Sequence, residues 1–293
     1  MEDIVHLNRT DARYPALLRK LHDAPKELWL RGNLGALALP GIAVVGTRRA
    51  SPNGLQVARS YSRVFARAGA AVVSGLALGI DAAAHLGAID ENGVTIAVLG
   101  SGVDDDSIQP RTNFPIARRL LETNGLLISE DAPGTTPLPW HFPRRNRIIA
   151  ALARVTVVIE APQQSGALIT AKFALEVGHD VYAVPSDVTR ETARGSNKLI
   201  AFGAPPLLDP QELVATLFES VPRLAAPGTV RTPPHTPTEE KILAALAVGV
   251  LHVDDVTSAT HLPAATVHAA LAALELRGEV TALGNMQFSR AKS

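Results

Sequence analysis

The most informative stretch of the sequence interleaves aromatic and basic residues. It runs from Trp140 to Arg147 as Trp-His-Phe-Pro-Arg-Arg-Asn-Arg and precedes an apolar segment. Aromatic rings stack on unpaired bases and arginines hold a phosphate backbone, so the pattern indicates binding of a single nucleic-acid strand. The candidate residues are Trp140, Phe142, Arg144, Arg145 and Arg147. A structural alternative stays open, in which Asn146 ties down the loop and an arginine pairs with Glu130 or Asp131.

Two loops that lead from a predicted strand into a predicted helix have the composition of an anion site. Residues 46–51 read Gly-Thr-Arg-Arg-Ala-Ser, and Ser165 opens a second helix after a loop of small residues. Unpaired N–H groups and the helix dipole favour a phosphate at a helix N-terminus. If the two preceding strands are neighbours, both helix ends and two cations converge on one phosphate. The candidate binding residues are Gly46, Thr47, Arg48, Ser165, Gly166 and Lys172. A solvent-facing arginine pair and an ordinary surface lysine are the alternatives.

Catalysis and cofactor binding are both disfavoured. Ser74, Asp81 and His85 have the types of a hydrolytic triad, but the last two lie one helical turn apart and no G-x-S-x-G surrounds the serine. The loop at 100–106 holds a lone G-x-G and three aspartates, for which a solvated loop is favoured over a metal site. The dinucleotide fingerprint G-x-G-x-x-G is absent. We therefore expect a binding protein with no catalytic residue, metal or cofactor.

Along the sequence that carries these residues, apolar strand patterns alternate with amphipathic helix patterns. This alternation predicts an α/β fold with a mainly parallel sheet covered by helices on both faces. The first helix is expected to begin at Pro52 with Ser51 as its N-cap and to end near Ala68. The predicted strands are 41–46, 71–74, 95–99, 125–129, 155–160 and 180–184.

The chain is expected to have four parts. Residues 1–40 are predicted to be a helical lead-in that packs Tyr14 to Leu18 against the sheet, and 41–220 form the main domain. Residues 221–237 contain five prolines and are predicted to be an extended linker. Residues 238–293 are predicted to form a winged helix, because three helices precede a hairpin with a turn at Gly284-Asn285. Its helices are expected at 238–247, with Thr238 as cap, 253–260 and 263–277.

Composition limits the possible environments. The formal net charge is +0 with 46% hydrophobic residues, so nucleic-acid binding must come from local clustering of cations rather than an overall basic field. There are no cysteines, and no apolar run approaches the roughly 20 residues of a membrane span. With no signal peptide after Met1, the expectation is a soluble cytoplasmic protein without membrane contact.

Several motifs in one order resemble the DNA-processing protein A (DprA, also called Smf) family over about Ile42 to Asp209. They are V-G-T-R at 45–48, V-S-G-L-A-x-G-I-D-x-x-A-H at 73–85, I-A-V-L-G-S-G-V-D at 96–104, S-E at 129–130, F-P-x-R-N-R-I-I-A at 142–150, E-A-P-Q-Q-S-G-A-L-I-T-A at 160–171, V-P at 184–185 and N-K-L-I-x-x-G-A at 197–204.

The resemblance implies an extended Rossmann-like domain at 41–220 and single-stranded DNA binding in a homodimer. It also implies protection of incoming DNA and loading of the recombinase RecA in natural transformation, the uptake of DNA by competent cells. The family's basic pocket carries over to Arg48, Lys172, Arg144, Arg145 and Arg147.

The chain departs from the family pattern at two places, and two other functions are alternatives to the one that the family implies. Gln109-Pro110 stands where Tyr-Pro is usual, and Pro185-Ser186 where Pro-Gly is usual. Many members carry a further helical domain before the segment that starts at Tyr14, so a missing N-terminal domain stays open. The rival enzyme is a Rossmann-like phosphoribohydrolase, which needs a glutamate that the segment 165–172 lacks. A winged-helix transcription factor is the third candidate, but its recognition helix offers only Arg277.

Overall fold

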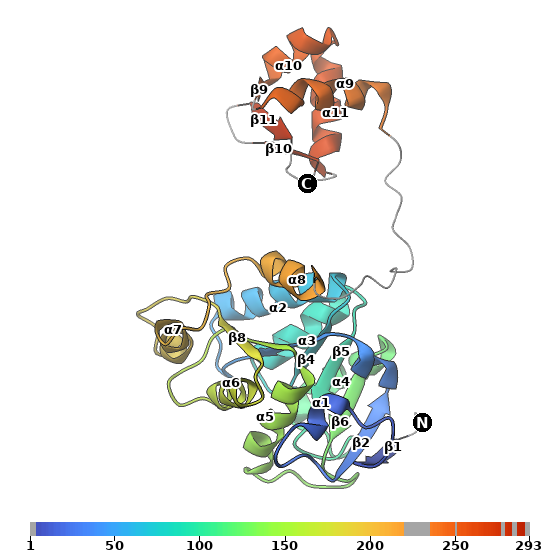
Figure 1. Ribbon diagram of the computed structural model, residues 1–293, viewed down its shortest axis with the longest axis vertical. Helices are drawn as coiled ribbons and strands as arrows, with labels where there is room; N and C mark the ends of the chain where they lie inside the picture. Colours follow the sequence, from blue (N-terminus) through green and yellow to red (C-terminus); the bar gives the residue numbers. More distant parts are fainter. Residues whose placement is uncertain (1–3, 220–234, 250, 277–278, 283–285, 291–293) are drawn as a thin grey trace. The chain divides into compact units, whose positions relative to one another are not determined.

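The computed structural model describes residues 4–219, 235–249, 251–276, 279–282 and 286–290. The chain divides into two compact units, Met1–Pro222 and Arg223–Ser293 (Figure 1). The larger unit carries the candidate site, and the smaller one is a separate α/β module.

The larger unit is built on one eight-stranded sheet in the order β1-β2-β6-β5-β4-β3-β7-β8. All pairs among β3 to β8 are parallel, whereas β2 pairs antiparallel with β6 and with β1. The strands are β1 (Val5–Asn8), β2 (Glu27–Gly32), β3 (Gly41–Val45), β4 (Ala71–Ser74), β5 (Thr95–Val98), β6 (Leu126–Ser129), β7 (Val155–Val158) and β8 (Asp180–Ala183). The predicted α/β fold with a mainly parallel sheet is confirmed.

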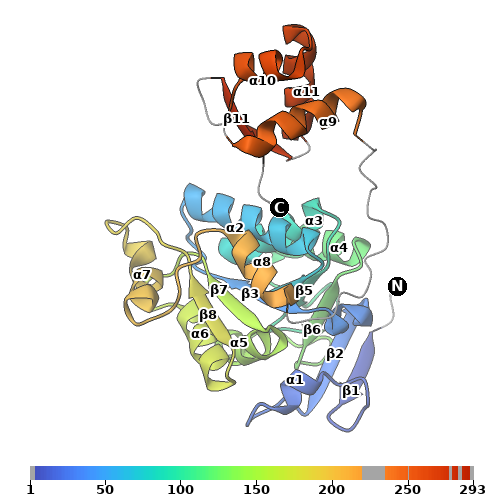
Figure 2. The ribbon, with the colours of Figure 1, turned by 45° about the horizontal axis from the view of Figure 1, so that its top comes forward.

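Helices cover both faces of this sheet, as Figures 1 and 2 show. One layer consists of α2 (Pro52–Arg67), α3 (Ile80–Asp90), α4 (Phe114–Glu122) and α8 (Pro210–Glu219). The other layer contains α1 (Ala16–Arg19), α5 (His141–Leu152) and α6 (Gly166–Glu176). Every residue of β3 to β7 is buried, which explains why these strands are apolar almost throughout rather than alternating. The short α7 (Arg194–Ala201) lies next to β8 at one end of the sheet.

The helix after β3 begins as its sequence predicts. The Ser51 hydroxyl accepts a hydrogen bond from the Gly54 N–H, and Pro52 occupies the first turn. A serine cap satisfies an otherwise unpaired N–H, and proline loses nothing there because that position has no hydrogen-bond partner to give up. The helix start is therefore fixed by local chemistry.

The prediction of a helical lead-in at residues 1–40 is wrong. The segment supplies β1 and β2, which extend the sheet beyond β6, and the only α-helix among its described residues 4–40 is the four-residue α1. Alternate side chains of β2 are buried, as expected for a strand with one covered face. The expected packing of Tyr14 to Leu18 does occur, because Leu18 is buried and the Tyr14 hydroxyl donates to the Pro25 carbonyl oxygen over 2.8 Å.

The smaller unit confirms the winged helix. Its helices are α9 (Pro237–Ala245), α10 (Val253–Thr260) and α11 (Ala264–Leu276), and its strands are β9 (Leu251–His252), β10 (Val280–Ala282) and β11 (Gln287–Arg290). Thr236 rather than Thr238 caps α9, in a reciprocal pair with Glu239 that forms a capping box. The predicted turn at Gly284-Asn285 and most of the predicted linker lie outside the described residues.

The strand order fixes where a ligand can bind. From β3 the chain proceeds through β4, β5 and β6 on one side, and then returns to place β7 and β8 on the other. The loops after β3 and β7 therefore diverge to opposite faces of the sheet and leave a crevice at the carboxyl ends of these strands. Ligands of doubly wound sheets bind at this kind of topological switch point. Among the described residues, no helix has the length and apolar character needed to cross a membrane.

Candidate nucleic-acid interface

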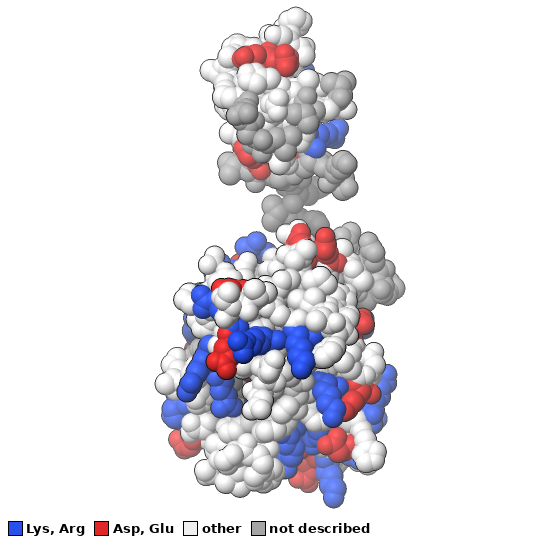
Figure 3. All heavy atoms as spheres, turned by 90° about the vertical axis from the view of Figure 1, so that its left-hand side faces the viewer, with Lys and Arg blue, Asp and Glu red and all other residues white. Residues whose placement is uncertain are grey.

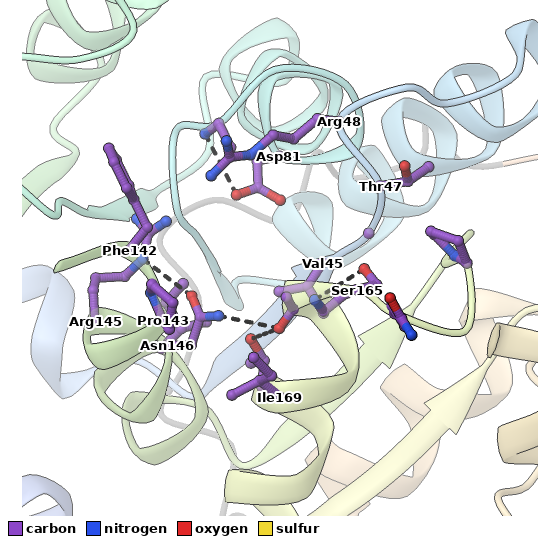
Figure 4. Close-up of a pocket in the computed structure, with 18 of the residues that line it drawn as sticks. Val45, Thr47, Arg48, Asp81, Phe142, Pro143, Arg145, Asn146, Ser165 and Ile169 are labelled. Atoms are coloured by element: carbon purple, nitrogen blue, oxygen red, sulfur yellow. Dashed lines mark hydrogen bonds between the residues drawn. The ribbon is translucent and has the colours of Figure 1, made fainter. Parts of the chain in front are cut away.

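A pocket of about 650 Å³ occupies the switch point between β3 and β7. Four groups of residues line it: the loop after β3, Ala77 and Asp81 around the start of α3, the N-terminal half of α5, and the segment around the start of α6 (Figure 4). The side chains that bear on binding are Thr47, Arg48, Arg49, Asp81, Phe142, Arg145, Asn146, Gln164, Ser165 and Thr170. Asp81 is the acidic residue of this lining and three arginines belong to it, so the pocket is locally basic.

The loop that carries Arg48 is attached to the end of β7. The Thr47 N–H donates to the Glu160 carbonyl oxygen over 2.7 Å, and the Ser51 hydroxyl donates to the Glu160 carboxylate over 2.7 Å. Gly46 is required at the turn, because a Cβ there would lie 2.5 Å from Ile80. These contacts hold the start and the end of the loop and leave Arg48 exposed.

Arg48 lies over an aromatic ring at the edge of the pocket. Its guanidinium carbon is 5.4 Å from the centroid of Phe142, within the range of a cation–π contact. A second, mainly apolar pocket of about 200 Å³ adjoins this pair and is also lined by Leu78, Gln109 and Pro110. Within the described part of the chain, Arg48 forms no ion pair. A free cation and an aromatic face thus stand side by side.

The three arginines of α5 have different surroundings. Arg147 is buried and pairs with the Glu130 and Asp23 carboxylates, each over 2.7 Å. Arg144 is partly exposed, pairs with Glu130 and Asp131, and covers the Trp140 ring at 4.8 Å. The structural alternative of an arginine paired with Glu130 or Asp131 therefore holds for both of these residues, and neither lines the main pocket.

Arg145 lines the pocket but is buried beneath it. Its guanidinium donates to the carbonyl oxygens of Gly75 and Val98 at the ends of β4 and β5. A Cβ on Gly75 would lie 2.5 Å from this guanidinium, so the glycine admits the close approach. Burial lowers the pKa of Arg145 to about 10, against the opposing effect of Asp81, so the group stays charged at neutral pH.

Asn146 links α5 to α6, as its expected role in tying down the loop requires. Its side-chain amide donates to the Gly166 carbonyl oxygen over 3.1 Å, and its oxygen accepts from Arg145. Ser165 caps α6 by accepting from the Ala167 N–H. The base of the pocket is therefore a rigid set of hydrogen bonds between two helices.

Ser74, Asp81 and His85 do not form a catalytic relay. The Ser74 hydroxyl donates to the Val44 carbonyl oxygen, and both ring nitrogens of His85 are occupied by Thr95 and the Leu76 N–H. Thr95 donates its own proton to the Val72 carbonyl oxygen, so His85 is neutral with its proton on Nδ1. The group shapes the loop after β4, where Leu76 adopts a left-handed φ of 59°.

Two of the three aspartates of the loop after β5 also have structural partners. Asp104 accepts from the Gly134 N–H and the Ser107 hydroxyl, each over 2.8 Å, and Asp105 pairs with Arg31. Among the described residues, no group of three His, Cys, Asp or Glu side chains is arranged to hold a metal ion.

Lys172 and Arg48 are not brought together, although their strands are neighbours. β3 and β7 pair in parallel, as the expected convergence requires. Lys172 lies well inside α6, 78% of its side chain is exposed, and its nearest carboxylate is Glu176 at 3.7 Å. It is outside the lining of the pocket, so the two cations do not face one phosphate there.

Comparison with known proteins shows to which family the chain belongs. The family model described as DNA recombination-mediator protein A matches residues 6–218, and the DprA winged helix domain matches residues 226–286. The chain belongs to the DNA recombination-mediator protein A family. It is similar to protein Smf of Escherichia coli, at 36% identity over 98% of this chain and 78% of that protein. It is also similar to the DNA processing protein DprA of Streptococcus pneumoniae, at 42% identity over 70% and 71% of the two chains.

Solved structures of family members superpose on the larger part of the chain. The X-ray structure of DprA from Streptococcus pneumoniae gives a TM-score of 0.67 at 38% identity, over 73% of this chain and 74% of that one. DprA from Helicobacter pylori, described for its single-stranded DNA binding mode, gives 0.66 at 28% identity, over 75% and 99%. The larger part of the chain thus shares its fold with solved members of the family, and the winged helix is matched by a family model of its own.

Reasoning from the sequence did not single out Arg49, which lines the pocket, or Glu160, which supports the loop of Arg48. Arg49 lines the pocket beside Arg48, and the repetition Arg-Arg in the loop was the available signal. Glu160 is almost fully buried and holds the loop of Arg48. The sequence signal for Glu160 was an acidic residue directly after the apolar run that contains β7. A carboxylate at such a buried position needs a specific partner.

Arg147→Ala is expected to destabilise the fold rather than weaken DNA binding. The change leaves the buried Glu130 carboxylate with Arg144 as its remaining partner, so we expect a loss of about 3 kcal/mol in the free energy of unfolding. Asp23→Ala, which removes the exposed partner, should cost about 1 kcal/mol or less. Urea unfolding measures both, and a normal stability of Arg147→Ala combined with weak DNA binding would contradict the structural role.

His85 is expected to make the fold sensitive to mild acid. Burial, with a further effect of Arg145, lowers the pKa of His85 to about 3. An unfolded histidine titrates near pH 6.5. Between about pH 6.5 and pH 3, therefore, only the unfolded chain takes up the proton, and the free energy of unfolding decreases as the pH is lowered. The contribution of His85 to the free energy of unfolding should decrease by up to about 1.4 kcal/mol for each pH unit. In urea unfolding between about pH 7 and pH 5, the stability of His85→Asn should decrease less with falling pH than that of the wild type. If the stabilities of the two proteins fall in parallel, His85 is not the group responsible.

Proposed function

We propose that the chain binds single-stranded DNA without catalysis, in the pocket at the switch point of the larger unit. One observation carries this proposal: the exposed guanidinium of Arg48 lies against the Phe142 ring at the edge of the pocket. A cation for the phosphate and an aromatic face for the base are the two elements of sequence-independent single-strand binding. The single-stranded DNA binding described for the Helicobacter pylori relative supports the same conclusion.

The distribution of charge supports an anionic ligand despite the net charge of zero. Lys and Arg side chains form a band across one face of the larger unit, interrupted by a few acidic groups, beside a hollow (Figure 3). Arg48 and Arg49, in the loop after β3, are exposed and line the pocket; Arg194 and Lys198 are further exposed cations, on α7. We propose that Arg48 and Arg49 make the main phosphate contacts, with Lys172 as a peripheral cation.

We further propose that the bound strand is incoming DNA that the protein protects and transfers to RecA in the cytoplasm during natural transformation. The family's description as a recombination mediator supports this role, since a mediator delivers DNA to a recombinase. A homodimer is part of the proposal. Phe202 and Leu208, which are 77% and 71% exposed and follow the edge strand β8, provide an apolar surface for self-association.

The rival phosphoribohydrolase function gains no support from the pocket. Asp81 is the acidic residue of its lining, and this carboxylate accepts hydrogen bonds from the N–H groups of Gly75 and Ala77. The winged helix is proposed to have an accessory role. Acidic residues such as Glu240, Asp254 and Asp255 offset its few cations, which leaves little counterion release to gain. Assays of nucleotide hydrolysis beside binding to single and double strands separate these functions.

Arg48→Ala is expected to weaken binding of all single-stranded sequences alike. The loss of one phosphate contact should flatten the salt dependence by roughly 0.7 log units of affinity per log unit of salt. Stability should change by less than about 0.5 kcal/mol, because the side chain is exposed. Fluorescence anisotropy across a salt series measures the slope. Lys172→Ala removes an equal charge outside the pocket and should have a smaller effect; an equal or larger one would place the strand along α6 instead.

Phe142→Ala is expected to weaken binding while the salt dependence stays the same. Loss of one base-stacking contact costs roughly 1–3 kcal/mol, and no phosphate contact is removed. Trp140→Ala is the matched comparison, since this ring is 53% exposed but is covered by Arg144. We expect the larger loss for Phe142. If both variants bind oligonucleotides with normal affinity, neither aromatic ring contacts a base.

A further inference from the structure

A buried carboxylate of the larger unit occupies the position where its fold would bind a phosphate. Glu160, two residues after the end of β7, is 1% exposed and lies at the N-terminus of α2. One carboxylate oxygen accepts hydrogen bonds from the Ser51 N–H over 3.1 Å and the Ser51 hydroxyl over 2.7 Å. The other accepts from the Thr192 hydroxyl. The anion is thus fully bound by the protein itself.

The place of this carboxylate in the fold gives it a functional meaning. α2 follows β3, the strand at which the order of the sheet reverses. In doubly wound sheets, the phosphates of a bound nucleotide lie at the N-terminus of the helix after this strand, against its unpaired N–H groups and dipole. Here the same helix end already has its negative charge, from the neighbouring strand.

The fit of Glu160 against α2 leaves no room for a second anion. A Cβ on Gly54, in the first turn of α2, would lie 2.2 Å from the carboxylate, so the glycine allows this close contact. The Thr47 N–H is also engaged, by the Glu160 carbonyl oxygen. A phosphate at this helix end would have to displace the side chain and would meet its charge at short range, where repulsion inside a protein is strong.

We infer that Glu160 is a built-in anion that denies free nucleotides the phosphate position of the fold and so makes the pocket selective for a polymer. With α2 closed, the exposed cations in the lining of the pocket are Arg48 and Arg49, because Arg145 is buried. Such contacts are too few to hold a mononucleotide, whereas a strand can use them together with stacking and further cations. The part about the polymer rests on the proposed function; the closure of the phosphate position does not.

The experiment compares the full-length wild type with Glu160→Ala in chloride and in inorganic phosphate at equal ionic strength. The alanine variant should melt at a lower temperature in chloride and recover in phosphate, because the anion refills the vacated helix end. It should also bind AMP at least about tenfold more tightly than the wild type in calorimetry. The wild type should respond equally to both salts. Thr192→Val, which loses one hydrogen bond but keeps the carboxylate, should behave like the wild type.

The inference is overturned if phosphate and AMP affect Glu160→Ala no more than the wild type. Should the variant be unfolded in chloride, recovery of its helical circular dichroism in phosphate supports the inference and failure to recover overturns it. Glu160→Gln removes the charge but still fills the position, so it should stay insensitive to phosphate; a response equal to that of alanine would refute occupancy. DNA is absent from these measurements, so a wild type that fails to bind single strands contradicts the proposed function alone.

Discussion

The hydrogen bonds of the buried Arg145 guanidinium are the interaction on which the rest of the site depends. It joins α5 to the carbonyl oxygens at the ends of β4 and β5, and through Asn146 it is connected to the first turn of α6. Phe142 lies one helical turn before it, so the position of that ring follows from this anchor. A buried charge is tolerated only with such partners, which makes the arrangement rigid.

The arginines of this protein divide into structural and exposed groups, although they share one residue type. Arg145 and Arg147 are buried with carbonyl and carboxylate partners, whereas Arg48 stands free beside an aromatic ring. The sequence pattern of aromatic and basic residues falls on the helix that lines the pocket with Phe142 and Arg145, but periodicity does not distinguish the two groups. Which arginine faces the ligand depends on acidic partners such as Asp23, which lies 124 positions earlier in the chain.

What the sequence predicts well is what local chemistry decides. The strands β3 to β8 and the capped start of α2 follow from apolar runs and from Ser51-Pro52. The strands β1 and β2 escaped prediction because they are only half-buried and so lack a continuous apolar run; β2 pairs with β6, and β1 pairs with β2. Glu160 escaped for a related reason, since its role arises from β7 lying beside β3, a matter of topology rather than of motif.

The polar groups of the site are mostly occupied within the protein, and this limits what the pocket can do. Asp81, His85, Glu160 and Arg145 each have hydrogen-bond partners inside the fold. These hydrogen bonds fix the loops around the pocket in place. In the proposed function, recognition is left to exposed cations and an aromatic face at the edge. Contacts of this kind are individually weak and independent of base sequence. They suit a protein that must hold any strand and release it again, as the proposed transfer to a recombinase requires.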